Sequence, residues 1–346
     1  MKAIAKRVLS LCLCFLILCS LFSCKKEEKF SKTYLEYFDT VTTLTVANVE
    51  KSEFLKASEF VEAELERYHK LFDIYNLYEG INNIKLINDN AGISPVGVSD
   101  ELIEFLDYSI ELHDTTRGYF NIALGSVLKL WRECREEAKK SPEAATIPSV
   151  ESLESASAHT DIKDIDINVQ DKTVFLKDKD MSLDVGAIAK GFATQRVYDG
   201  LRELGYKDFV LSIGGNVIAS GKKNDSSPWQ VAIENPSDTT KNLHSLSLSE
   251  KSLVTSGSYQ RYYTVGNEKY HHIINPYSLA PENIYLSVSV LHEDSALADA
   301  MSTALFNMTY ELGSDLVKNF SDLEVMWVLK DGNIRYTDNF LSYVNS

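Results

Sequence analysis

The spacing of apolar residues changes along the chain, and this change constrains the fold more than any other feature. Between residues 54 and 140 apolar side chains recur at helical spacing, as in Val61, Leu65 and Phe72. From about residue 165 onward, short runs of β-branched and aromatic residues dominate, and only two helical patterns interrupt them. Helices early and strands late predict an α+β fold, with mixed or antiparallel sheets flanked by helices.

The pattern also gives approximate element boundaries. We expect helices at 54–72, 99–118, 124–140, 188–204 and 296–309, the second capped by Ser99 and closed by Gly118. We expect strands at 38–46, around 165, and at 173–176, 209–213, 229–233, 284–291, 325–329 and 334–336. Residues 141–149 hold two prolines and small polar side chains, which indicates a loop and not a domain boundary.

The first residues have the composition of an export signal. Lys2, Lys6 and Arg7 precede an apolar run at 8–22, which is too short for a comfortable membrane span. The stretch that ends Leu-Phe-Ser-Cys24 resembles the bacterial lipobox, in which the cysteine becomes the lipidated first residue of the mature protein. The alternative is a plain signal peptide with an incidental cysteine.

These features divide the chain into three parts. We predict a lipoprotein signal peptide at 1–23, a short solvated tether at 24–32 after the lipidated Cys24, and a single domain at 33–346. Four of the five cysteines, at positions 12, 14, 19 and 24, lie in or next to the signal, so only Cys134 remains in the folded body. An internal disulfide is therefore excluded, although export would permit one.

The charge of the mature chain restricts its ligands. Removing residues 1–23 takes away three cations and no acids, which changes the net charge from −15 to −18. Such an acidic chain without a basic stripe argues against nucleic-acid binding. Any phosphate site must also create its own positive field, from a metal ion, helix N-termini or a few local cations.

Segment 183–191, with the sequence Leu-Asp-Val-Gly-Ala-Ile-Ala-Lys-Gly, has the strongest ligand-binding pattern. A predicted strand delivers Asp184 and Gly186 to a turn that opens a helix, whose free amides and positive dipole end suit phosphate. Lys190 adds a cation one turn into that helix. Read alone, such a turn is as often a packing device, and it lacks the glycine spacing of a Walker loop.

The predicted helix at 296–309 carries two hard oxygen ligands. Asp299 and Thr303 are four residues apart and share one helix face. Mg²⁺ prefers such oxygens and is often held by one or two carboxylates together with substrate phosphates. The alternative is that Asp299 is a surface acid, but its apolar neighbours weaken that interpretation, since a carboxylate among them needs a partner.

Two further segments are individually weak signals. The run at 211–216 ends in two glycines and an asparagine, which is typical of a tight turn. His271 and His272 are adjacent in an apparent strand, so they point to opposite faces and argue against a paired-histidine metal centre. A lone histidine at a given face is more often structural than catalytic.

Taken together and in this order, segments 184–191, 214–216, 256–262, 272–276 and 298–305 resemble the ApbE family of FAD:protein FMN transferases. The resemblance extends from about residue 38 to residue 309 and is looser at the N-terminal end. It implies an ApbE-like flavin transferase fold with one flavin site in a single catalytic domain at 33–346.

The resemblance also implies roles for individual residues. The residues that would line FAD are Phe38, Phe120, Asn121, Ile122, Asp184, Lys190 and Ile274. The backbone carbonyl of Ala187, with Asp299 and Thr303, would hold Mg²⁺. This chain departs from the family pattern at Asn121 and Asn275, where the family commonly has Asp, and some members carry an acid in place of Ser302. Any role of the first two carboxylates in catalysis would be lost here.

The activity implied is transfer of the FMN half of FAD onto a Thr or Ser hydroxyl of a target protein, with release of AMP. His272 is our candidate for orienting the hydroxyl or accepting its proton. The implied partner is a subunit of a membrane redox complex, and lipid on Cys24 would hold the enzyme on a bacterial membrane, facing the periplasm. Two alternatives stay open: a metal-dependent FAD pyrophosphatase that releases FMN and AMP, and a non-catalytic lipid-anchored flavin-binding protein.

Overall fold

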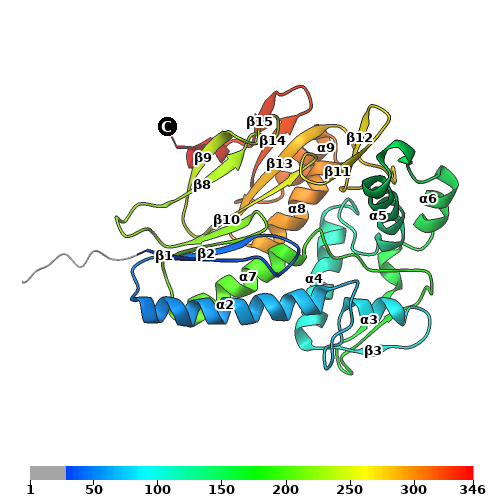
Figure 1. Cartoon of the computed structure of the whole chain (residues 1–346), viewed down its shortest axis with the longest axis horizontal. Helices are drawn as coiled ribbons and strands as arrows, with labels where there is room; N and C mark the ends of the chain where they lie inside the picture. The colour runs from blue at the N-terminus through cyan, green and yellow to red at the C-terminus, as the bar shows by residue number, and fades with distance from the viewer. Residues whose placement is uncertain (1–28, 346) are drawn as a thin grey trace, which may run out of the picture.

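An eight-stranded sheet forms the centre of the molecule in the computed structural model, which describes residues 29–345 (Figure 1). Every neighbouring pair in it is antiparallel, in the order β1-β2-β6-β7-β10-β13-β14-β15. Its strands are β1 (Phe30–Tyr34), β2 (Thr42–Val46), β6 (Phe209–Ile213), β7 (Asn216–Ser220), β10 (Lys251–Gly257), β13 (Tyr285–His292), β14 (Glu324–Leu329) and β15 (Ile334–Tyr336).

Three small sheets surround it. They consist of β3 (Val96–Gly97), β5 (Thr173–Leu176) and β4 (Ile165–Asn168); of β8 (Trp229–Glu234) and β9 (Asn242–Leu248); and of β11 (Tyr262–Val265) and β12 (Glu268–His271). Their strand pairs are also antiparallel. The expected α+β class with antiparallel sheets is therefore confirmed.

The helices lie mainly on one side of the large sheet, where α2, α7 and α8 pack against it and against one another (Figure 1). They are α2 (Lys51–Phe72), α3 (Ile84–Asp89), α4 (Asp100–Thr115), α5 (Gly125–Lys140), α6 (Val150–Ser157), α7 (Ala189–Glu203), α8 (Ser295–Asn307) and α9 (Tyr310–Val317). Short 3₁₀ turns occur at Pro142–Ala144, Ile162–Asp164 and Phe340–Tyr343. No helix in the described range is both long and apolar enough to cross a membrane.

The opposite face of the sheet is covered by the β8–β9 hairpin and the last 3₁₀ turn. Trp229 and Leu246 of the hairpin pack with Leu291, Met326 and Phe340 in one buried cluster. Strands β13 and β14 are thus enclosed on both faces, and nearly all of their residues are buried.

Helix α8 packs against β10 and β13 of the sheet and lies beside α7 on the same face, so it is buried on nearly every side. Nearly all of its residues are buried, and it is apolar around most of its circumference, as expected for a core helix. Asp294 caps it by accepting hydrogen bonds from the amides of Ala296 and Leu297. The polar face formed by Asp299 and Thr303 is therefore held in a fixed position inside the fold.

Several predicted boundaries are correct and others need correction. Ser99 caps α4 as expected, by accepting from the amide of Leu102. The strand expected at 38–46 begins only at Thr42, because Phe38 and Asp39 have positive φ angles that a strand cannot contain. The tether expected to reach residue 32 ends earlier, since β1 starts at Phe30, and α6 follows the predicted loop. The signal peptide and Cys24 lie outside the described residues.

Candidate active site

A cleft of about 900 Å³ forms where the start of α7, one face of α8 and helix α5 meet three loops, at 38–41, 73–76 and 272–276. Strand β10 completes one wall. These segments are far apart in sequence, so the cleft exists only in the folded chain.

Nine of the residues expected at the flavin and metal site line this cleft. They are Phe38, Asn121, Asp184, Ala187, Lys190, His272, Ile274, Asp299 and Thr303. The segments that contain Asp184 and Asp299 are in direct contact, which is the juxtaposition that metal-assisted phosphate chemistry requires here.

Phe120 and Ile122 were also expected at the flavin, but their side chains do not line the cleft. Both are fully buried in the main hydrophobic core, away from the cleft wall. Only Asn121 between them lines the cleft, because the packed core takes up the apolar side chains on either side of it. Their contribution is to fix the backbone that carries Asn121.

Asp299 is the most strongly held acid of the site. Its side chain is buried, with 4% of the residue exposed. Its Oδ2 accepts hydrogen bonds from the backbone amide of Gly191 at 2.8 Å and from Nδ2 of Asn216 at 2.7 Å, and Nζ of Lys190 lies 3.7 Å away. Burial raises the pKa of Asp299, and the charge of Lys190 opposes this shift.

The oxygen donors at the cleft fit a hard divalent cation. Asp299 offers a carboxylate whose contacts with Gly191, Asn216 and Lys190 all use Oδ2, so Oδ1 is its candidate ligand atom. Thr303 lies one turn further along the same face, with its hydroxyl 3.5 Å from that of Ser256. Ala187 lines the same cleft. A carboxylate, a hydroxyl and a carbonyl match the preference of Mg²⁺ for oxygen.

The start of α7 differs in part from what the sequence suggested. The amide of Gly191, expected to meet a phosphate, donates to Asp299, so an acid from α8 caps α7. The amide of Gly186 donates to Oδ1 of Asp184 at 3.1 Å. These two amides hold protein carboxylates instead of a ligand, and the positive end of the helix dipole stabilises the charge of Asp299.

The adjacent histidines do point in different directions. His271 is buried beside Phe306, and its Nε2 lies 2.8 Å from the carbonyl of Glu282. His272 lines the cleft, and its Nδ1 lies 3.2 Å from the carbonyl of Arg261. Because a carbonyl only accepts, Nδ1 carries the proton and Nε2 is the free acceptor. Burial, and then the nearby Arg261, lower the pKa of His272 to about 3, so its ring is neutral at physiological pH.

Sequence reasoning assigned no role to several residues of the cleft. Tyr75, Arg132 and Asn216 line it, as do Arg135 and Arg261. With Lys190, Arg135 and Arg261 supply the local positive charge that an acidic chain needs near a diphosphate, whereas Arg132 is paired with Asp184. Nothing in the sequence distinguishes Arg132 from any other arginine on an amphipathic helix, so only the fold reveals it.

The two departures from the family pattern have structural reasons. Nδ2 of Asn275 donates to the Glu282 carboxylate and to the backbone carbonyl of Asn307, both at 3.0 Å. Nδ2 of Asn121 donates to the carbonyl of Thr160, also at 3.0 Å. An aspartate at either position could not donate, and at 275 it would face a second carboxylate. These asparagines therefore hold the walls of the cleft together.

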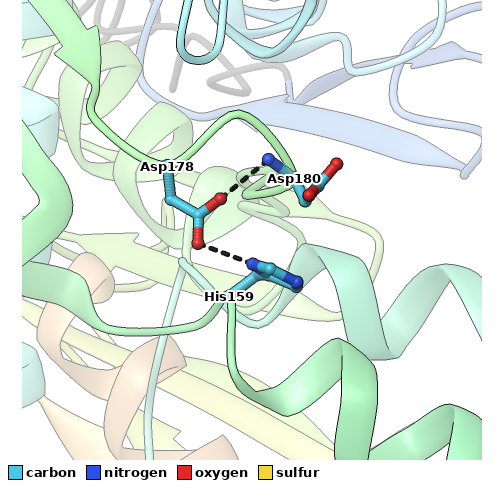
Figure 2. Close-up of side chains that lie close together, drawn as sticks. All are labelled: His159, Asp178 and Asp180. Carbon is cyan, nitrogen blue, oxygen red and sulfur yellow. Dashed lines mark hydrogen bonds and ion pairs between the residues drawn. The ribbon is translucent and has the colours of Figure 1, made fainter.

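A second group of possible metal ligands lies outside the cleft. His159, Asp178 and Asp180 have ligand atoms within 4.8 Å of one another (Figure 2). However, His159 Nδ1 and Asp178 Oδ2 already pair at 2.6 Å, and the other oxygen of Asp178 accepts from the amide of Asp180. This geometry is that of an ion pair beside a turn, and the hydrogen bond with His159 lowers the pKa of Asp178.

Known proteins match this chain over most of its length. The model of the ApbE family matches residues 38–327. The FAD:protein FMN transferase of Klebsiella pneumoniae is 29% identical over 272 residues, which cover 78% of this chain and 81% of that protein. The enzyme of the same name from Treponema pallidum is also 29% identical, over 80% of this chain and 79% of that one.

Solved structures show the same fold. The ApbE protein of Thermotoga maritima superimposes with a TM-score of 0.81 at 24% identity, covering 92% of this chain and all of that one. The flavinyl transferase ApbE of Pseudomonas stutzeri gives a TM-score of 0.75 at 25% identity, covering 93% of this chain and 98% of that one.

Proposed function

This chain belongs to the ApbE family, and we propose that it transfers the FMN half of FAD to a Thr or Ser hydroxyl of a target protein, with Mg²⁺ bound and AMP released. The observation that carries the proposal is the contact between the Asp299 carboxylate and the start of α7 at Gly191. Because of this contact, the face of α8 that carries Asp299 and Thr303 lies beside the turn that begins at Asp184.

The residues of the cleft divide the work between charge and position. A Mg²⁺ ion on Asp299 and Thr303 would supply Lewis-acid stabilisation of the diphosphate. Lys190, close to Asp299, and Arg135 and Arg261 of the cleft add positive charge around the same group. Phosphoryl transfer depends mainly on such positioning and charge stabilisation, so the chain needs no covalent intermediate.

The transfer step itself replaces one phosphorus–oxygen bond by another. The hydroxyl oxygen of the target attacks the FMN-side phosphorus, the bond from that phosphorus to the bridging oxygen breaks, and AMP leaves. Nε2 of His272 can accept a hydrogen bond from the attacking hydroxyl and orient it. Because the pKa of His272 is lowered to about 3, orientation is favoured over full proton removal, and the proton passes to solvent.

The decisive experiment follows every product after incubation with FAD and Mg²⁺. We expect mass spectrometry to find AMP together with an FMN-modified acceptor peptide that contains Thr or Ser, and neither product in excess chelator. Free FMN and AMP with no modified peptide would replace the transferase by an FAD pyrophosphatase. A stoichiometric yellow complex that never releases AMP would replace it by a flavin-binding protein. Full labelling in chelator would remove the metal from the mechanism.

The pH dependence of transfer should reflect Asp299 and not His272. In the metal-free protein the pKa of Asp299 is raised, so protons compete with Mg²⁺ for its carboxylate at a higher pH than they would at an ordinary aspartate. Transfer should therefore weaken as the pH falls, and less so at high Mg²⁺ concentration. His272 stays neutral down to about pH 3, so it contributes no inflection near its ordinary value of 6.5. Initial rates between about pH 4 and pH 9 test this. An inflection near 6.5 that disappears in His272→Asn would contradict it.

We also propose that the enzyme is anchored to a membrane through lipid on Cys24 and modifies a subunit of a membrane redox complex. Five residues separate Cys24 from Phe30, where β1 begins, so this stretch of chain spans at most roughly 20 Å. The body would then lie close to the bilayer that holds its target. A Cys24→Ala variant should leave the membrane fraction; if it stays there, another anchor is at work.

A further inference from the structure

Arg132 connects two walls of the cleft. From α5, its Nη1 donates to Oδ2 of Asp184 and to the hydroxyl of Tyr75, each at 3.1 Å. The guanidinium carbon also lies 5.1 Å from the centre of the Tyr75 ring. The side chains of Arg132 and Asp184 are 25% and 16% exposed, so water screens their charges only in part.

This contact lies on the wall between two cavities. A second cavity of about 840 Å³ adjoins the cleft, and Ile74, Tyr75, Arg132 and Asp184 line both. Asp73 fixes the loop that carries Tyr75, by accepting from the amides of Tyr75 and Asn76 and from the hydroxyl of Tyr78. The tyrosine is thus held from its backbone by Asp73 and from its hydroxyl by Arg132.

Asp184 presents an electrostatic difficulty that Arg132 can resolve. A carboxylate on the wall of a site for a dinucleotide diphosphate repels the ligand. Its Oδ1 accepts from the amide of Gly186, and its Oδ2 accepts from Arg132, so both oxygens are turned toward donors of the protein. The positive charge of Arg132 also offsets the negative charge of the Asp184 carboxylate at short range.

We propose that Arg132 is a positioning residue for FAD: by neutralising Asp184 and holding Tyr75, it sets the affinity of the cleft for the dinucleotide and leaves the transfer step largely unaffected. This inference rests on the proposed function, because it takes FAD as the ligand. It differs from direct recognition of phosphate by an arginine, since here the charge acts through Asp184.

The test compares FAD binding and transfer kinetics in the full chain with Mg²⁺ present. Arg132→Met should raise the Kd and KM for FAD about tenfold or more, the loss expected for a charged hydrogen bond, with kcat changed less than about threefold. Arg132→Lys keeps the charge but not the bridge to Tyr75, so it should lie between wild type and Arg132→Met. Lys139→Met removes an exposed cation of the same helix, paired with Glu136, and should leave the Kd unchanged.

The double variant Arg132→Met/Asp184→Asn provides the sharpest readout. If Arg132 acts mainly by neutralising Asp184, removing both charges should recover most of the affinity for FAD that Arg132→Met loses, while the part due to the bridge to Tyr75 stays missing. A double variant as weak as Arg132→Met would overturn the proposal, as would wild-type affinity in Arg132→Met itself. FAD binding is measured by fluorescence and needs no acceptor protein. If the wild-type protein bound FAD but transferred no FMN, that result would count against the proposed function and not against this inference.

Discussion

Asp299→Asn is expected to reduce FMN transfer by roughly 10³-fold while the protein remains folded. The substitution keeps the shape of the side chain but removes the only charged oxygen in the donor set of Asp299, Thr303 and Ala187. A bound metal supplies several kcal/mol of charge stabilisation, and each 1.4 kcal/mol is a factor of ten in rate. The measurement is the initial rate of acceptor labelling at saturating FAD, over a series of Mg²⁺ concentrations.

The stability of this variant should change little, for a physical reason. The carboxylate is costly to bury, which is why its pKa is raised, and its interactions with Gly191, Asn216 and Lys190 offset that cost. An amide at the same place loses the pairing but also the cost of burying a charge. Asp107→Asn, on the exposed face of α4, is the matched control and should transfer FMN at the wild-type rate. Wild-type transfer by Asp299→Asn would mean that the metal, if present, binds elsewhere.

Much of the cleft could be predicted because the residues proposed as ligands follow local rules. Asp299 and Thr303 share a helix face by their spacing alone, and the glycine-rich turn before α7 is a continuous segment. The order of such segments along the chain was enough to indicate the family and the antiparallel α+β fold. The apolar neighbours of Asp299 also predicted its burial correctly.

What could not be predicted depends on contacts between distant segments. The contact of Asp299 with Gly191 and Asn216 joins residues more than 80 positions apart, and no spacing rule gives it. Tyr75 and Arg132 meet only because α5 packs beside the loop after α2. The first residues of the edge strand β1, up to Lys32, were assigned to the tether because this stretch is largely polar. In the fold, only alternate residues of β1 face the protein, and Lys32 pairs with Glu62 at the surface.

Short elements were missed for a related reason. Helix α6 and strand β3 have eight and two residues, too few for a periodic pattern to stand out from a loop. Phe120 and Ile122 were expected to line the flavin because all three residues of the stretch 120–122 were assigned the same role. In the folded chain, its polar residue faces the cleft and its apolar residues fill the core.

Gly191→Ala is expected to lower both stability and activity, because α7 and α8 touch at this position. A Cβ at residue 191 would lie 2.5 Å from Cβ of Asp299 and 2.5 Å from the carbonyl oxygen of Ser295. Neither contact can be relieved by rotating a flexible side chain, so the two helices must move apart. Overpacking of this kind costs about 1–3 kcal/mol, and it should be visible as a lower midpoint of thermal or urea unfolding.

The same movement pulls the amide of Gly191 away from Asp299, so FMN transfer should fall although every proposed ligand is still present. This separates geometry from chemistry: Asp299→Asn should lose transfer and keep stability, whereas Gly191→Ala should lose both. Gly97→Ala is the matched control, since nothing lies within 4 Å of the added Cβ there. If Gly191→Ala kept both wild-type stability and wild-type labelling of the acceptor, the close approach of α7 and α8 would not be what positions Asp299, and the metal site would need a different support.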